Sequence, residues 1–187
     1  PQNTTISGDA TAMDEFIKNC ESAEISCQRL SVSHAFHSYL MEPILEEFES
    51  FALGINFSLP QIPLISNLTG ELANDQITTP NYWREHIRSS VQFQQGVAAM
   101  AQEDLDAIVE IGPTPALVGM AKRCQPDWSV ATIASLRKGK PDVTALMDGL
   151  AELYVAGGTI DWRSFDRPWN FNRVELPTYP FDRQYYW

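Results

Sequence analysis

Ala107-Ile108-Val109-Glu110-Ile111 is a short, mostly apolar run that Gly112-Pro113 interrupts at once. Such a run is typical of a buried strand, and the glycine and proline after it indicate a turn. The turn has neither a G-x-G-x-x-G nor a G-K-[ST] pattern, so we expect it to be structural rather than phosphate-binding. Residues 116–123 return to a helical pattern, and residues 130–136 have the pattern of one more strand. Strands that alternate with helices predict an α/β core with a largely parallel sheet.

The N-terminal part of the chain predicts a small α+β unit. Residues 4–7 have the pattern of the end of a strand, and apolar residues between 13 and 20 repeat at helical spacing. Thr11 and Asp14 form a capping-box pattern at the start of that helix. Residues 27–33 alternate as a half-buried strand does. The two strand patterns and the helix pattern between them would make up half of a small α+β unit.

Between this unit and residue 107 the pattern is mainly helical. An apolar stripe predicts a helix from Pro43 to Gly54, and two more helical patterns lie within residues 80–103. Prolines enclose a short apolar strand at residues 60–67.

The last third of the chain changes in composition. Residues 137–141 are basic and end in proline, and we place a domain boundary there. An amphipathic helix over residues 146–154 follows, and after it the chain is broken by prolines and rich in aromatic residues. We expect this tail to lie on another protein surface, because it would otherwise expose a large apolar area.

Composition excludes several classes of function. The chain has 187 residues, of which 44% are hydrophobic, so it can form one domain or somewhat more with a real core. A net charge of −11 argues against binding to nucleic acid or to a membrane surface. Three cysteines without C-x-x-C spacing suggest neither a disulfide framework nor a zinc site, and fit a reducing cytoplasm. There is no apolar run of about 18 residues and no signal-peptide pattern, and Pro1 looks like a cut through a longer chain.

Two of the three histidines lie three residues apart in the segment Val32-Ser33-His34-Ala35-Phe36-His37-Ser38-Tyr39-Leu40-Met41-Glu42-Pro43, where an extended stretch becomes a helix. A neutral imidazole is well suited to moving a proton near pH 7. A capping or half-buried structural role for His37 is the alternative. An H-x-x-H metal site is disfavoured, because the sequence shows no third ligand cluster. The chain also contains no G-x-S-x-G, the pattern that carries a nucleophilic serine.

This segment resembles the histidine motif of the malonyl-CoA:acyl-carrier-protein acyltransferases of modular type I polyketide synthases, and matching segments continue to Trp187. The resemblance implies that His37, directly before Ser-x-Leu-Met-Glu-Pro, is the general base for a serine nucleophile and the acid toward the departing thiol. In that family the serine, the oxyanion-hole donors and the arginine for the malonate carboxylate lie before the point where this chain begins. We therefore assign no residue of this chain to those roles.

His34-Ala35-Phe36-His37 also matches the signature that accompanies malonyl extender units in this family, whereas Tyr-Ala-Ser-His accompanies methylmalonyl units. The resemblance therefore places His34 and Phe36 in the substrate site, where the Phe36 ring would fill the space of an α-methyl group. One methyl group is worth about 1 to 3 kcal/mol, or roughly 10-fold to 200-fold in preference. The role of His34 stays open, and the alternative for Phe36 is a place in the core.

Three further positions follow from the matching segments. The family orients its histidine with a backbone carbonyl from the segment at residues 89–93, and the position carried over is Gln92. Asn67 matches a segment near the active site and is assigned to substrate binding, with a turn-forming asparagine as the default interpretation. We interpret His86 as structural, because it is a lone histidine inside an amphipathic helix.

The resemblance implies three regions. Residues 1–33 would be the end of a ferredoxin-like small subdomain, residues 34–137 the C-terminal part of an α/β-hydrolase-like acyltransferase core, and residues 138–187 the linker after the acyltransferase. The last twelve residues match the part of that linker that lies over the acyltransferase and the preceding ketosynthase.

Our leading hypothesis is therefore an acyltransferase that moves a malonyl unit from malonyl-CoA, through an acyl-serine, to the phosphopantetheine thiol of an acyl carrier protein. It needs no bound cofactor or metal, and we expect this chain alone to be inactive. The alternative is a non-catalytic scaffolding piece that docks against a ketosynthase. A thiol enzyme that uses a cysteine with a histidine is disfavoured, because no cysteine lies at a strand-to-helix elbow.

Overall fold

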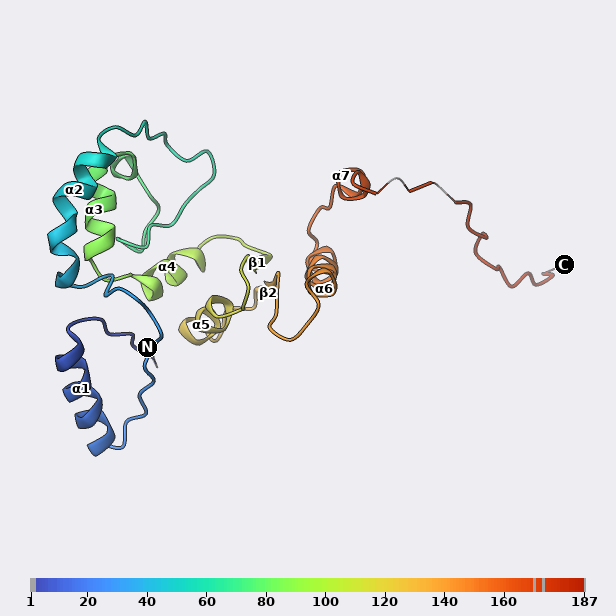
Figure 1. Ribbon diagram of the computed structural model, residues 1–187. Helices are drawn as coiled ribbons and strands as arrows, with labels where there is room; N and C mark the ends of the chain where they lie inside the picture. The colour runs from blue at the N-terminus through green and yellow to red at the C-terminus, as the bar shows by residue number, and fades with distance from the viewer. Residues whose placement is uncertain (1–2, 170, 173, 187) are drawn as a thin grey trace.

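The structure is a computed structural model, and it describes residues 3–169, 171–172 and 174–186. Expectations that involve Pro1 or Trp187 lie outside these residues. In Figure 1 the helices α1, α2 and α3 lie at one side of the molecule, two strands lie at its centre, and the C-terminal tail runs away at the other side. No helix among the described residues is long and apolar enough to cross a membrane.

The centre of the fold is a strand–helix–strand unit. Strand β1 (Ala107–Glu110) pairs in parallel with β2 (Ala131–Ala134), and the register runs from Ala107 opposite Ala131 to Glu110 opposite Ala134. Helix α5 (Leu117–Cys124) connects the strands and packs on both, while α6 (Asp142–Val155) packs on β2 from the other side (Figure 1). This confirms the predicted α/β class and the parallel pairing.

A glycine lets α6 lie close to the sheet. A Cβ atom on Gly149 would be 3.0 Å from the carbonyl oxygen of Ala134, so any larger residue would push the helix outward. Ile133 is 2% exposed and Ala145 is 3% exposed, and these residues form the core between β2 and α6. Close backbone approach is a common reason for a glycine inside a helix.

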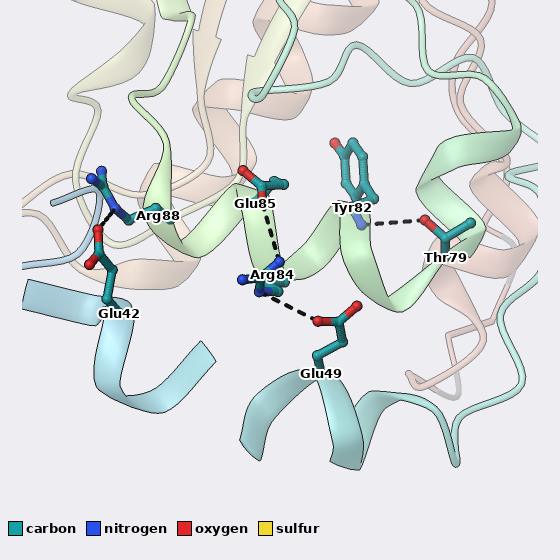
Figure 2. Close-up of polar contacts among 7 residues, drawn as sticks. All are labelled: Glu42, Glu49, Thr79, Tyr82, Arg84, Glu85 and Arg88. Atoms are coloured by element: carbon teal, nitrogen blue, oxygen red, sulfur yellow. Dashed lines mark hydrogen bonds and ion pairs between the residues drawn. The ribbon is translucent and has the colours of Figure 1, made fainter. Parts of the chain in front are cut away.

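Helices α2 (Glu42–Ala52) and α3 (Pro80–Arg88) form an antiparallel pair, shown in Figure 2. Glu42 Oε1 at the start of α2 lies 3.0 Å from Arg88 Nε at the end of α3. Glu49 Oε2 lies 3.4 Å from Arg84 Nε, which is buried and makes this ion pair without the alignment of a hydrogen bond. An acidic residue at a helix start and a basic residue at a helix end both complement the helix dipole, so the first pair favours this antiparallel arrangement.

Helix α1 (Ala10–Ser22) is capped at its N-terminus by a different residue from the one predicted. The side chain of Asp9 accepts hydrogen bonds from the N–H groups of Thr11 and Ala12, so Asp9 is the N-cap and the capping box of Thr11 and Asp14 is wrong. Asp14 instead pairs with Arg29. The serine hydroxyl of Ser7 donates to the carbonyl of Phe36 at 2.8 Å and ties this part to the rest.

Three predicted strands are wrong. Residues 4–7 and 27–33 have no strand structure, and residues 60–67 contribute only one antiparallel bridge, between Ile65 and Leu72. A strand needs a neighbour that pairs with its N–H and C=O groups. The described residues offer these segments no such neighbour, so their alternating pattern does not become a strand.

The remaining elements are short. They are the 3-10 helices η1 (Tyr39–Met41) and η2 (Asp75–Thr78), and the helices α4 (Phe93–Met100) and α7 (Trp162–Asp166). The helices α2, α3, α4 and α6 confirm the predicted helical patterns, while α7 was not predicted. After α7 the described residues of the tail form neither helix nor strand, and large side chains such as Tyr179 and Phe181 are exposed there.

Candidate active site

His37 lies where the end of α3 meets the chain that enters η1 and α2. Its backbone has φ 63°, and its N–H donates to the carbonyl of Ile87 at 2.9 Å. The next residue, Ser38, is buried and donates from its hydroxyl to the carbonyl of Ala35 at 2.7 Å. A left-handed backbone at a residue other than glycine costs about 1 to 3 kcal/mol, and such residues cluster at functional sites. The surrounding hydrogen bonds hold the His37 backbone in this conformation.

The imidazole of His37 is oriented by a backbone carbonyl. Its Nδ1 lies 2.8 Å from the carbonyl oxygen of Ser89. A carbonyl can only accept, so Nδ1 carries the proton in the neutral ring and Nε2 keeps its lone pair. The ring is half-buried. An imidazole held in this tautomer can take a proton from a hydroxyl or thiol at Nε2 and return it later.

The orienting carbonyl belongs to Ser89 and not to Gln92, so the assignment to Gln92 is wrong. Ser89 follows the last residue of α3 and has an extended backbone, with φ −85° and ψ 155°, which turns its carbonyl away from the helix. Gln92 is the N-cap of α4, and its carbonyl accepts the N–H of Gly96 at 2.9 Å. A carbonyl that begins a helix is already used within it. The signal for Ser89 is therefore the predicted end of the preceding helix.

His34 and Phe36 lie beside His37. The ring centroids of Phe36 and His37 are 6.4 Å apart, and those of His34 and Phe36 are 6.2 Å apart. Phe36 is 47% exposed, and His34 is exposed with Nδ1 2.9 Å from the hydroxyl of Ser33. A ring that is half open and adjacent to the imidazole is in a position to contact a substrate. That role remains a prediction for both residues.

His86 is the neighbour that the sequence pattern did not connect to this site. Its ring lies edge-on to that of His37 with 6.0 Å between centroids, and it also contacts the rings of Trp83 and Tyr82. Burial lowers the pKa of His86, and the positive charge of His37 lowers it further. His86 is therefore neutral at pH 7. The two histidines are far apart in the sequence, and no local pattern connects them.

Asn67 is connected to the site through Gln92. The N–H of Gln92 donates to the carbonyl of Asn67 at 2.8 Å, and Asn67 is exposed. It lies in a turn that Ser66 fixes, because the buried Ser66 hydroxyl is 2.6 Å from the hydroxyl of Tyr82. Gly70 closes the turn with φ 75°, and a Cβ there would be 2.4 Å from Cβ of Gln95. Asn67 thus positions the start of α4, and its contact with substrate stays a prediction.

A shallow hollow of about 550 Å³ lies elsewhere, between β2 and α6. It is lined mostly by apolar side chains of these elements, among them Ile133 and Val155, and by none of the residues around His37. We attribute it to the uncovered side of the strand pair rather than to substrate binding. Within residues 3–169, 171–172 and 174–186, no group of three His, Cys, Asp or Glu side chains could hold a metal ion.

Comparisons with known proteins give a consistent result. A family model described as "Acyl transferase domain" matches residues 1–159. Over the whole chain the sequence is 37% identical to mycoketide-CoA synthase of Mycobacterium tuberculosis and 34% identical to polyketide synthase GfsA of Streptomyces halstedii. The acyltransferase domain from the second module of the salinomycin polyketide synthase has a TM-score of 0.82 at 36% identity. The acyl transferase domain of SpnD, in complex with 2-(pent-4-yn-1-yl)malonyl, has a TM-score of 0.77 at 31% identity.

The matched proteins are all longer than this chain. The chain covers 4% of the mycoketide-CoA synthase and 2% of GfsA. The match to the salinomycin domain covers 93% of this chain and 41% of that domain, and the match to SpnD covers 80% and 38%. The chain therefore corresponds to about two fifths of a solved acyltransferase domain.

Proposed function

Because this chain belongs to the acyl transferase domain family, we propose that it supplies the proton-transfer half of the active site of a polyketide synthase acyltransferase. One observation carries the proposal: Nδ1 of His37 is held 2.8 Å from the Ser89 carbonyl, which leaves Nε2 free to act as a base. The nucleophile would be a serine from another part of the complete domain.

The reaction would have two halves. In the first, Nε2 of His37 takes the serine proton as the serine oxygen attacks the thioester carbonyl of malonyl-CoA. The bond from carbon to sulfur breaks, and the imidazolium returns the proton to the coenzyme A thiolate. In the second, His37 takes the proton of the phosphopantetheine thiol of an acyl carrier protein, the thiolate attacks the acyl-serine, and the serine oxygen leaves with the proton. No metal or bound cofactor takes part in these steps.

A malonyl group as substrate is supported by two observations. The SpnD domain, which is similar to this chain, was crystallised with a malonyl derivative. In this chain Phe36 places a ring next to His37, where it would limit the space for a branch on the α-carbon. We assign His34 and Phe36 to the substrate site on this basis, and we place Asn67 at its margin.

We also propose the three-part organisation that the sequence predicts, with residues 138–187 as a linker that lies against an adjacent ketosynthase. The exposed aromatic side chains of the tail support such a contact, since large flat rings give much buried area on docking. Work in the cytoplasm would fit Cys20, Cys27 and Cys124, which are all free thiols.

The test is the replacement of His37 in the complete acyltransferase domain that contains this sequence. We expect His37→Ala to slow self-acylation by malonyl-CoA by about 100-fold to 10,000-fold, the usual contribution of a positioned acid and base. Acyl-enzyme formation is followed by intact-protein mass spectrometry. The control is Glu46→Ala, which changes an exposed residue of α2 and should acylate at the normal rate.

The alternative function is a scaffold that only docks against a ketosynthase, and it predicts the opposite result for the His37 variant. Under that hypothesis His37→Ala leaves acylation of the complete domain at its normal rate, while removal of residues 168–186 weakens the binding to the ketosynthase. Undiminished acylation in the His37 variant would therefore exclude our assignment of the base.

A further inference from the structure

Three residues at the end of α3 and just after it contact His37. The carbonyl of Ile87 accepts its backbone N–H, the carbonyl of Ser89 accepts its ring Nδ1–H, and the ring of His86 lies edge-on against the imidazole. The two carbonyls account for the hydrogen bonds of His37 in the proposed mechanism. The ring of His86 has no part in that mechanism, although it is the neighbour on the same helical turn.

We propose that His86 is a positioning residue for His37: its uncharged ring fixes the orientation of the imidazole and keeps this pair of histidines from carrying two protons. The proposal rests on the proposed function, since it concerns the same imidazole. It goes beyond that function because it gives a role to a residue that neither accepts nor donates a proton in the reaction.

The packing around His86 explains how its ring is fixed. The ring centroid is 6.0 Å from that of Trp83 and 6.2 Å from that of Tyr82, both on α3. The indole N–H of Trp83 donates to the carbonyl of Ile77 at 2.9 Å, and the Tyr82 hydroxyl bonds to Ser66. The ring of His86 that contacts His37 therefore packs on two rings that hydrogen bonds hold in place.

The charges around the pair explain why one proton is the limit. On α3 and α2, the carboxylates of Glu42 and Glu49 pair with Arg88 and Arg84, and Glu85 Oε1 lies 3.7 Å from Arg84. The chain that enters α2 carries the titratable side chains of His34, beside Phe36, and of Tyr39 in η1. The carboxylates of Glu42, Glu49 and Glu85 are therefore engaged with arginines and are not available to neutralise a second imidazolium.

The end of α3 favours one positive charge beside it, because the last carbonyls of a helix carry partial negative charge. Burial and the charge of His37 lower the pKa of His86, so His86 takes up a proton only at a lower pH than an ordinary histidine does. A proton on both rings would place two positive charges on rings whose centroids are 6.0 Å apart, and these charges would repel each other.

The first experiment uses His86→Ala and His86→Phe in the complete acyltransferase domain. We expect the alanine variant to lower kcat for malonyl transfer at least 10-fold while KM for malonyl-CoA changes less than twofold, because no substrate contact is lost. The phenylalanine variant keeps a flat ring and should recover kcat to within about threefold of the natural protein. Unchanged kcat in the alanine variant, or no recovery with phenylalanine, would overturn the positioning role.

The second experiment is independent of activity and is an NMR titration of the imidazole rings in the natural domain and in His37→Gln. We expect the pKa of His86 to rise in this variant, because the neighbouring positive charge is gone. A His86 titration that is the same in both proteins would overturn the proposed coupling. Because the readout needs no turnover, it remains decisive even if His37→Ala acylates normally and the proposed function itself fails.

Discussion

The backbone conformation of His37 is held by specific contacts, as the orientation of its side chain is. A residue with φ 63° directs its ring differently from a neighbour in an extended or helical conformation, and the carbonyls of Ile87 and Ser89, at and just after the end of α3, hold this residue in place. The cost of the strained backbone is about 1 to 3 kcal/mol. It is offset by hydrogen bonds that also select the tautomer, so the same group of contacts fixes the backbone and leaves the lone pair on Nε2.

Phe36 leads to a prediction at the same scale. The double variant His34→Tyr, Phe36→Ser removes the ring beside His37 and opens space for an α-methyl group. We expect the preference for malonyl-CoA over methylmalonyl-CoA, measured as a ratio of kcat/KM, to fall by roughly 10-fold to 200-fold. Phe36→Leu keeps an apolar side chain of similar bulk and should retain most of the preference. A ratio that the double variant leaves unchanged would remove Phe36 from the substrate site.

The residues around His37 show how much of the candidate site could be predicted from the sequence. The family resemblance was enough to predict that a backbone carbonyl from residues 89–93 orients His37, and the structure shows such a carbonyl. The resemblance was not enough to choose between Ser89 and Gln92, since that depends on where α3 ends and where α4 begins. The contact between His86 and His37 joins residues 49 positions apart in the sequence, and no local pattern reports such a contact.

At the scale of elements, the turn after β1 gives the clearest prediction. The carboxylate of Glu110 accepts hydrogen bonds at 2.9 to 3.1 Å from the backbone N–H groups of Ala116, Leu117 and Val118, which lie at the start of α5. The expectation of a structural turn is thus explained, because a side chain of the protein itself occupies the place where an anion would bind. We expect Glu110→Gln to destabilise the complete domain by about 1 kcal/mol, the usual worth of a helix cap.

The same contacts set a pH dependence. Burial alone would raise the pKa of Glu110, but the three hydrogen bonds together lower it below its ordinary value of 4.5. The folded protein therefore holds the carboxylate to lower pH than the unfolded chain, so the stabilisation is complete above pH 4.5 and is lost as the pH falls through the lower folded value. Urea unfolding at several pH values should show this loss in the natural domain and in Glu46→Gln, the exposed control, but not in Glu110→Gln. Parallel pH profiles in all three proteins would contradict the assignment.

The helices and the central strands were predictable because their patterns are satisfied within short stretches of chain. An amphipathic helix makes its own hydrogen bonds, and β1 and β2 are consecutive strands joined by a single crossover through α5. The patterns at residues 27–33 and 60–67 are equally clear, yet a strand forms only where a partner edge is present. The sequence of one segment says which side could be buried and does not say whether anything lies there to bury it.

The whole molecule exposes more surface than a compact protein of its mass. Its accessible area is 15369 Å² for 21.0 kDa. A compact monomer of this mass would expose about 9000 Å². Large apolar side chains are exposed on several elements, including Phe51 on α2, which is 75% exposed, and Ile111 after β1, which is 88% exposed. These faces match the two fifths of an acyltransferase domain that the chain represents, because the other three fifths would cover them.

This surface predicts how the chain behaves by itself. Expressed alone, these 187 residues should bind the dye ANS strongly and unfold without a cooperative thermal transition, because too little apolar area is buried to offset the loss of chain entropy. The complete acyltransferase domain should unfold cooperatively and bind little dye under the same conditions. Calorimetry and ANS fluorescence on both proteins, with sedimentation to exclude aggregates, make the comparison. The contrary result would be a monomeric isolated chain with a sharp transition at the temperature of the complete domain. It would show that the exposed apolar faces do not need the rest of the domain to cover them. The proposal that the active site is divided between two parts of one fold would then have to be abandoned.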